Sequence, residues 1–153
     1  MDEDFTKAKN IVFRLLNIRL RSEKEVQCKL KHKRFSDDIC AQTIAYFKHI
    51  GLIDDQSFAR KWIMYRLARP FGASRIKLEL KDKGINPDTI EKELIQALAE
   101  FPQDDIAIQL AQKKALKYQG VDPLKKKQRI YGFLARRGFK VETILKALKK
   151  IWP

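Results

Sequence analysis

Apolar residues in the middle of the chain are separated by intervals of four, five, five and four. They are Ile76, Leu80, Ile85, Ile90 and Leu94. A spacing of four keeps side chains on one face of a helix, whereas an interval of five indicates an interruption between helices. The pattern predicts a helix, a tight turn and a second helix, with the apolar faces of the two helices in contact.

The same intervals occur twice more along the chain. They relate Val26, Leu30, Phe35, Cys40 and Ile44, and again Ile130, Leu134, Phe139, Ile144 and Leu148. A further amphipathic segment precedes each pair, and Ala8, Ala59 and Ala111 align within these segments. No segment alternates with the period of a strand. We therefore predict an all-α protein of three tandem three-helix repeats at residues 5–54, 55–103 and 104–153. Because a unit this small cannot bury enough surface alone, we expect neighbouring units to stack into an elongated, curved array.

The residues between the paired helices agree with this division. Gly84 and Gly138 occupy the same column, where a helix ends and a positive φ is favoured. Arg34 occupies that column in the first repeat and is a weaker stop signal. Ser22 and Glu25 have the spacing of a capping box, which predicts that a helix begins immediately after Ser22.

Charge is the strongest compositional signal. Lys and Arg total 33 against 19 Asp and Glu, which gives a net charge of +14. Residues 1–54 carry 11 basic and 8 acidic residues, residues 55–105 carry 9 and 9, and residues 106–153 carry 13 and 2. A balance this basic favours an anionic partner, most often nucleic acid.

The basic residues concentrate in two stretches, and we predict that they contact nucleic acid or a protein–DNA filament rather than only solvent. The candidates are Arg60, Lys61, Arg66, Arg69, Arg75, Lys77, Lys81 and Lys83 in the middle repeat, and Lys125, Lys126, Lys127, Arg129, Arg136 and Arg137 in the third. Aromatic residues lie among them, and most aromatic residues at helical spacing pack in a core. Tyr65 and Tyr131 are the two that we select as candidates for stacking on bases.

Other classes of protein find little support. No apolar stretch has the length of a membrane span, the first ten residues do not resemble a secretory signal, and two cysteines are too few for a disulfide framework, so we expect a cytoplasmic protein. Cys28 and His32 are one helical turn apart, but no paired metal-binding motif accompanies them. We expect no metal, no cofactor and no catalytic centre, and therefore no enzyme.

One continuous run resembles a known family. The stretch GLIDDQSFARKWIMYRLARPFGASRIKLELKDKGI, residues 51–85, is similar to the central signature of the RecX regulatory proteins. The similarity depends on Gly51-Leu52-Ile53-Asp54-Asp55, Phe58-Ala59-Arg60, Gly72, Glu79-Leu80 and Lys83-Gly84-Ile85. It extends over essentially the whole chain, although the third repeat is looser, and family members often have glycine where this chain has Arg34.

The resemblance implies a function. RecX proteins modulate the RecA recombinase: they bind in the groove of the RecA–single-stranded DNA filament and inhibit its extension, ATPase, strand exchange and coprotease activities. The implied processes are recombinational DNA repair and the SOS response. The implied partners are the RecA filament and single-stranded DNA, with non-specific duplex DNA as a further candidate, and we expect the protein itself to be a monomer.

Two other functions stay open on the residues alone. The first is a stand-alone DNA-binding protein whose helix–turn–helix units read a duplex, and the second is a scaffold for acidic proteins. The helix predicted after Asn86 argues against the first in the middle repeat, because Glu91 and Glu93 would meet phosphates unfavourably.

Overall fold

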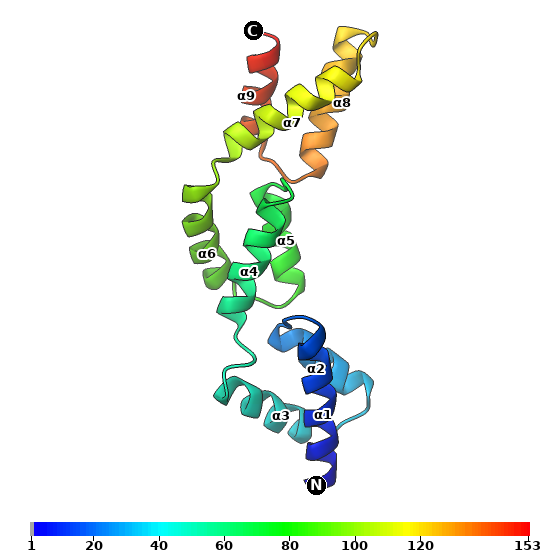
Figure 1. The fold of residues 1–153 in the computed structure, drawn as a ribbon, viewed down its shortest axis with the longest axis vertical. Coiled ribbons are helices and arrows are strands. Elements are labelled where there is room, and N and C mark those ends of the chain that lie inside the picture. Colours follow the sequence, from blue (N-terminus) through cyan, green and yellow to red (C-terminus); the bar gives the residue numbers. More distant parts are fainter. Residues whose placement is uncertain (1) are drawn as a thin grey trace.

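The computed structural model describes residues 2–153, and these residues form nine α-helices and no strand (Figure 1). The helices are α1 (Asp2–Ile18), α2 (Glu23–His32), α3 (Asp37–His49), α4 (Asp55–Leu67), α5 (Ala73–Asp82), α6 (Pro87–Glu100), α7 (Gln103–Lys117), α8 (Pro123–Arg136) and α9 (Val141–Ile151). The predicted all-α class is confirmed.

Each group of three successive helices packs around its own apolar cluster. The close helix pairs lie within α1–α3, within α4–α6 and within α7–α9, and three separate groups of buried residues correspond to them. Ala8, Ala59 and Ala111, which align in the sequence, are each 0% exposed, because only a small side chain fits where the first helix crosses the third. The three units follow one another along a bent axis with the termini at opposite ends (Figure 1).

The turns between the paired helices share one backbone geometry. Gly84 and Gly138 have φ values of 78° and 89°, and Arg34 adopts 68° in the equivalent place. The first repeat thus keeps the turn although its side chain disfavours a positive φ. The Ser22–Glu25 capping box is present at the start of α2.

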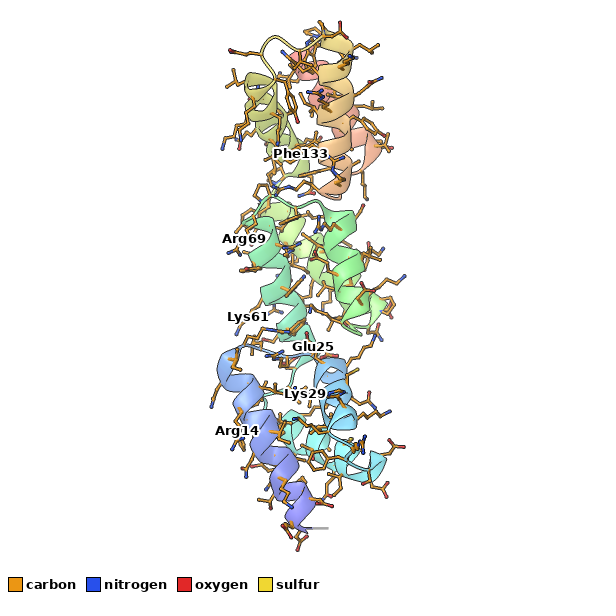
Figure 2. All side chains as sticks on the ribbon, turned by 90° about the vertical axis from the view of Figure 1, so that its right-hand side faces the viewer. Arg14, Glu25, Lys29, Lys61, Arg69 and Phe133 are labelled. Carbon is orange, nitrogen blue, oxygen red and sulfur yellow. The ribbon has the colours of Figure 1, made fainter. Side chains whose placement is uncertain are left out.

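The units meet at two joints of the same design. At the first joint, the hydroxyl of Ser22 at the start of α2 donates to the carbonyl of Lys83 at the end of α5, at 2.8 Å. At the second joint, the amide of Gly72 at the start of α5 donates to the carbonyl of Arg137 at the end of α8, at 2.6 Å. Helices α2, α5 and α8 therefore lie end to end along one side of the molecule (Figure 2). Their dipoles align head to tail, which favours this stacking.

The two joints differ in what holds them. The first uses side chains: besides Ser22, the ammonium of Lys24 donates to the carbonyl of Asp82 at 3.1 Å and Asp55 accepts from the amide of Glu23 at 2.9 Å. The second also has side-chain hydrogen bonds, from Arg75 to the carbonyl of Arg136 and from Arg137 to that of Arg69, each at 3.0 Å. It differs in bringing two backbones together at Gly72, where a Cβ would lie 2.2 Å from the carbonyl carbon of Gly138. Glycine is required at this position for the close approach itself.

Candidate nucleic-acid interface

Basic side chains gather on the face formed by the first and second helices of each unit. Figure 2 shows Arg14, Lys61 and Arg69 along one edge of this face and Lys29 on α2 toward its middle. The third helices α3, α6 and α9 lie behind (Figures 1 and 2). A polyanion lying along the molecule would therefore contact all three units on one side.

A cleft of about 1030 Å³ opens on this face at the first joint. Its lining is Leu15, Arg21, Lys24, Glu25, Cys28, Lys29, His32, Trp62, Arg66, Glu79, Asp82 and Lys83. Positive side chains outnumber acidic ones in this list. The Nε atom of Arg21 is buried there without a hydrogen-bond partner, and burial lowers the pKa of its guanidinium. We call this hollow the joint cleft.

Glu25 neutralises part of the joint cleft and connects the first two units. Its carboxylate accepts from both terminal nitrogens of Arg19, at 2.9 and 3.1 Å, from the ammonium of Lys83 at 2.9 Å and from the Ser22 amide at 3.1 Å. Burial alone would raise the pKa of Glu25, but these hydrogen bonds lower it to about 2. The carboxylate is therefore ionised at neutral pH and acts as a structural counterion between the units.

Glu79 has the equivalent role inside the second unit. It pairs with Arg66 through two hydrogen bonds and with Arg75 at 3.3 Å, and it accepts from the indole nitrogen of Trp62 at 3.0 Å. Arg66 is only 15% exposed along its side chain. This pair fixes Trp62 and Arg66 as a wall of the joint cleft.

Planar groups stack at the second joint. The guanidinium of Arg66 lies 3.7 Å from the ring centroid of Phe71, and those of Arg75 and Arg137 each lie 4.7 Å from it. Arg137 also lies 5.2 Å from the centroid of Phe133, which Figure 2 shows on the face of the third unit. Aromatic rings and guanidinium planes of this kind bind single-stranded nucleic acids without sequence preference.

The structure divides the predicted contact residues into two groups. Those with a partner inside the chain are Arg60 with Glu93, Arg66 and Arg75 with Glu79, Lys77 with Glu91, Lys83 with Glu25, and Arg137 with the carbonyl of Arg69. Those whose side chains have no acidic partner within residues 2–153 are Lys61, Arg69, Lys81, Lys125, Lys126, Lys127, Arg129 and Arg136. Positive charge in the second group is therefore not neutralised by a carboxylate of the described residues.

The two aromatic candidates lie in different surroundings. Tyr65 is 52% exposed, and the guanidinium of Arg69 lies 3.9 Å from its ring centroid. Tyr131 is half-buried against the core of the third unit, so less of its ring faces solvent. Glu93, which we placed with Glu91 on a surface that would repel phosphates, is instead 3% exposed and hydrogen-bonded by Gln56 and Arg60. The expected repulsion of phosphates is therefore wrong for Glu93, whereas Glu91 is exposed and pairs with Lys77 at 3.5 Å.

Sequence reasoning missed the contribution of the first unit. The joint cleft is lined by three basic residues of this unit, Arg21, Lys24 and Lys29. They were not among the predicted contact residues, because residues 1–54 carry only a small net charge. The sequence did contain a signal for them: Arg21 precedes the Ser22–Glu25 capping box and Lys24 lies within it. The equivalent position in the second repeat, Gly72, also lies among basic residues.

Other kinds of site have no support in the part of the chain that the structure describes. Residues 2–153 contain no group of three or more His, Cys, Asp or Glu side chains that could hold a metal ion. None of their helices has both the length and the apolar character needed to cross a bilayer. Cys40 is buried and Cys28 is exposed.

Fold and surface together define an elongated helical-repeat protein with a basic face that also carries aromatic side chains. Comparison with known proteins gives the family. Models described as the first, second and third three-helix domains of RecX match residues 8–47, 54–94 and 103–148. Regulatory protein RecX of Chlorobium phaeobacteroides (strain BS1) is 34% identical over 99% of this chain and 97% of that protein. The protein of the same name from Prosthecochloris aestuarii is 33% identical over 98% and 97%.

Comparison of the fold with solved structures indicates the same family. The crystal structure of RecX from Lactobacillus salivarius superposes with a TM-score of 0.85 and 26% identity, and the match covers 98% of this chain and 97% of the other. The chain belongs to the RecX family of regulatory proteins, as the resemblance of residues 51–85 predicts.

Proposed function

We propose that this protein binds the RecA–single-stranded DNA filament and inhibits filament extension, ATP hydrolysis, strand exchange and coprotease activity. Through this inhibition it modulates recombinational repair and the SOS response. The single observation that supports the proposal most is membership of the RecX family along almost the whole chain.

The shape and charge of the molecule support the same proposal. A filament is a linear array of identical protein subunits around a DNA strand, and this protein is a linear array of similar units with a basic face. The joint cleft and the stacked groups of the second joint lie on that one face, so DNA and the subunits around it would contact successive units. Phosphate contacts of this kind position a protein without reading sequence.

A stand-alone duplex reader is the less favoured candidate. The helix that would enter a groove in the second unit, α6, presents Glu91 and Asp88 to solvent, and both carboxylates would repel phosphates. The third unit is more basic, but family membership makes a RecA regulator the better proposal for the chain as a whole.

The test is ATP hydrolysis by RecA on single-stranded DNA with this protein at substoichiometric amounts. Inhibition is expected. The double variant Arg129→Ala with Arg136→Ala should weaken it, because both side chains are exposed on α8 and neither has an acidic partner in residues 2–153. Arg60 and Arg137 are poorer choices for this experiment, because their removal would also disturb Glu93 or the second joint.

The matched control removes the same charge from the opposite side. Lys92→Ala with Lys149→Ala changes two exposed lysines on the third helices α6 and α9. The control should inhibit as the natural protein does. Equal loss in both double variants would indicate a non-specific effect of net charge, and no inhibition by the natural protein would refute the proposal.

A further inference from the structure

A second hollow lies beside the joint cleft, between the segment that follows α1 and the outer side of α4. Its volume is about 420 Å³, and its lining is Arg19, Leu20, Phe58, Lys61, Trp62 and Tyr65. Four of these residues provide aliphatic or aromatic walls, and the other two carry positive charge at the rim. We call this hollow the apolar pocket.

The walls of the apolar pocket are held in place before any ligand arrives. Phe58 stacks on Trp62 with ring centroids 6.0 Å apart, and Tyr65 lies 6.3 Å from Trp62. The indole nitrogen of Trp62 is anchored on Glu79 at 3.0 Å. Preformed concave surfaces with apolar walls are the usual form of a binding site.

Two of the wall residues are partly exposed to solvent. Leu20 is 39% exposed and Tyr65 is 52% exposed. Both side chains border the same hollow instead of standing singly on the surface. Exposed apolar residues that gather around a hollow favour association with another molecule.

The chemistry of the walls favours an amino-acid side chain over a nucleobase. A base brings several polar edge groups, and each loses free energy when it is buried without a hydrogen-bond partner. The polar hydrogen of Trp62 is already donated to Glu79, and Phe58 and Leu20 have none to offer, so within the lining only Arg19, Lys61 and the hydroxyl of Tyr65 could pair with a base edge. An aliphatic or aromatic side chain needs no such partner.

The rim determines the charge of the ligand. Lys61 is exposed and has no acidic partner in residues 2–153, and Figure 2 shows it on the same edge as Arg69. Arg69 covers the ring of Tyr65 at 3.9 Å from the centroid. Arg19 shares its charge with Glu25. The rim is therefore cationic and complements carboxylates.

We propose that the apolar pocket binds an acidic peptide segment of a partner protein. One large apolar side chain of that segment packs against Leu20, Trp62 and Tyr65, and carboxylates on either side of it pair with Lys61 and Arg69. The peptide would share Lys61 and Arg69 with the edge of the basic face, but its apolar contact in the pocket is additional to any contact with nucleic acid, and its test does not require RecA.

The chain provides its own reporter for this test. It contains two tryptophans, so Trp152→Phe leaves Trp62, in the wall of the pocket, as the only indole. The probe is a blocked hexapeptide in which one Phe is flanked by Asp and Glu residues. Titration should change the fluorescence of Trp62 saturably. Replacing the Phe of the peptide by Ser should weaken binding at least about tenfold, because burial of the apolar ring is lost.

Matched variants of the protein assign the effect to the pocket. Leu20→Ser and Lys61→Glu should each weaken binding of the acidic peptide about fivefold or more, one through the apolar contact and the other through charge. Leu116→Ser and Lys92→Glu change exposed residues away from the pocket and should leave binding unchanged. Circular dichroism confirms that each variant is folded.

Three outcomes would overturn the proposal. The first is no saturable change with the acidic peptide, and the second is equal binding of the peptide that has Ser in place of Phe. The third is a response of Trp62 to oligothymidylate, lost in Leu20→Ser, that the peptide does not reproduce. That last result would assign the apolar pocket to a nucleobase.

Discussion

Replacing Gly72 by alanine should weaken the docking of the second unit on the third without disrupting the helix packing inside either unit. Gly72 has φ −80° and ψ 158°, a conformation open to any residue, and it has no side-chain cap to lose. Alanine at the start of a helix is slightly worse than glycine, by about 0.5 kcal/mol. Any larger effect must therefore come from contact with the neighbouring unit.

The size of that effect follows from the second joint. The new Cβ would lie 2.2 Å from the carbonyl carbon of Gly138, whereas ordinary contacts begin at 3.4 Å, so the two backbones must separate by more than 1 Å. Two backbone hydrogen bonds cross this joint and depend on its close approach, from the amide of Gly72 at 2.6 Å and from that of Ser74 at 3.1 Å. Each contributes about 0.5–1.5 kcal/mol, so about 1–3 kcal/mol of docking free energy is lost.

Urea unfolding followed at two tryptophans tests this reasoning. Trp62 reports the second unit and Trp152 the third, so Trp62→Phe and Trp152→Phe backgrounds separate the two signals. With a urea dependence of about 1–3 kcal/mol per molar, Gly72→Ala should lower the midpoint at Trp152 by about 1 M and move it away from that at Trp62. Small-angle scattering should show a broader range of molecular shapes.

Gly51→Ala is the control. Gly51 has φ 76° and nothing within 4 Å of an added Cβ, so alanine there introduces backbone strain of about 1 kcal/mol in the first unit only. It should leave the two transitions as they are in the natural chain. Coincident transitions at the natural midpoint in Gly72→Ala would refute the account of the second joint.

Further predictions concern charge and turns. The pKa of Glu25 is lowered from an ordinary 4.5 to about 2. The ionised carboxylate therefore contributes its full stabilisation of the folded state above about pH 4.5, and this contribution is lost as the pH falls from about 4.5 to about 2. Glu25→Gln should therefore lower the free energy of unfolding by on the order of 2 kcal/mol at pH 7, and the difference from the natural protein should nearly vanish at pH 2, as urea unfolding at both pH values would show. Glu93→Ala should destabilise the second unit by about 1–3 kcal/mol in urea unfolding, because the ion pair with Arg60 is lost. Arg60→Ala should cost a similar amount, because it leaves the buried Glu93 carboxylate without its cationic partner. Arg34→Gly should raise the melting temperature, by relief of about 1 kcal/mol at φ 68°, whereas Lys33→Gly, at φ −79°, should lower it.

Much of the fold is already determined by local sequence. Intervals of four place Ile76 and Leu80 on one helical face whatever surrounds them, and both are 0% exposed. Gly84 ends a helix because a positive φ is easy only for glycine, and the capping box at Ser22 forms from residues three apart. These features act over one or two turns of chain, and repetition of the pattern then gives three units.

The tertiary structure alone decides which charges are free. Arg60 and Lys61 are neighbours in the sequence, yet Arg60 is bound to Glu93, 33 residues away, and Lys61 stands free at the rim of the apolar pocket. The joint cleft likewise combines Lys29 of the first unit with Lys83 of the second, and only Lys83 of these two pairs with Glu25, at 2.9 Å. Pairing across the joints depends on how the units stack end to end, and no local sequence pattern specifies which side chains this stacking brings together. The sequence by itself determined the helices, the three-unit repeat and the excess of positive charge. Only the tertiary structure, through helix packing within each unit and stacking between units, decided where that charge is available to a ligand.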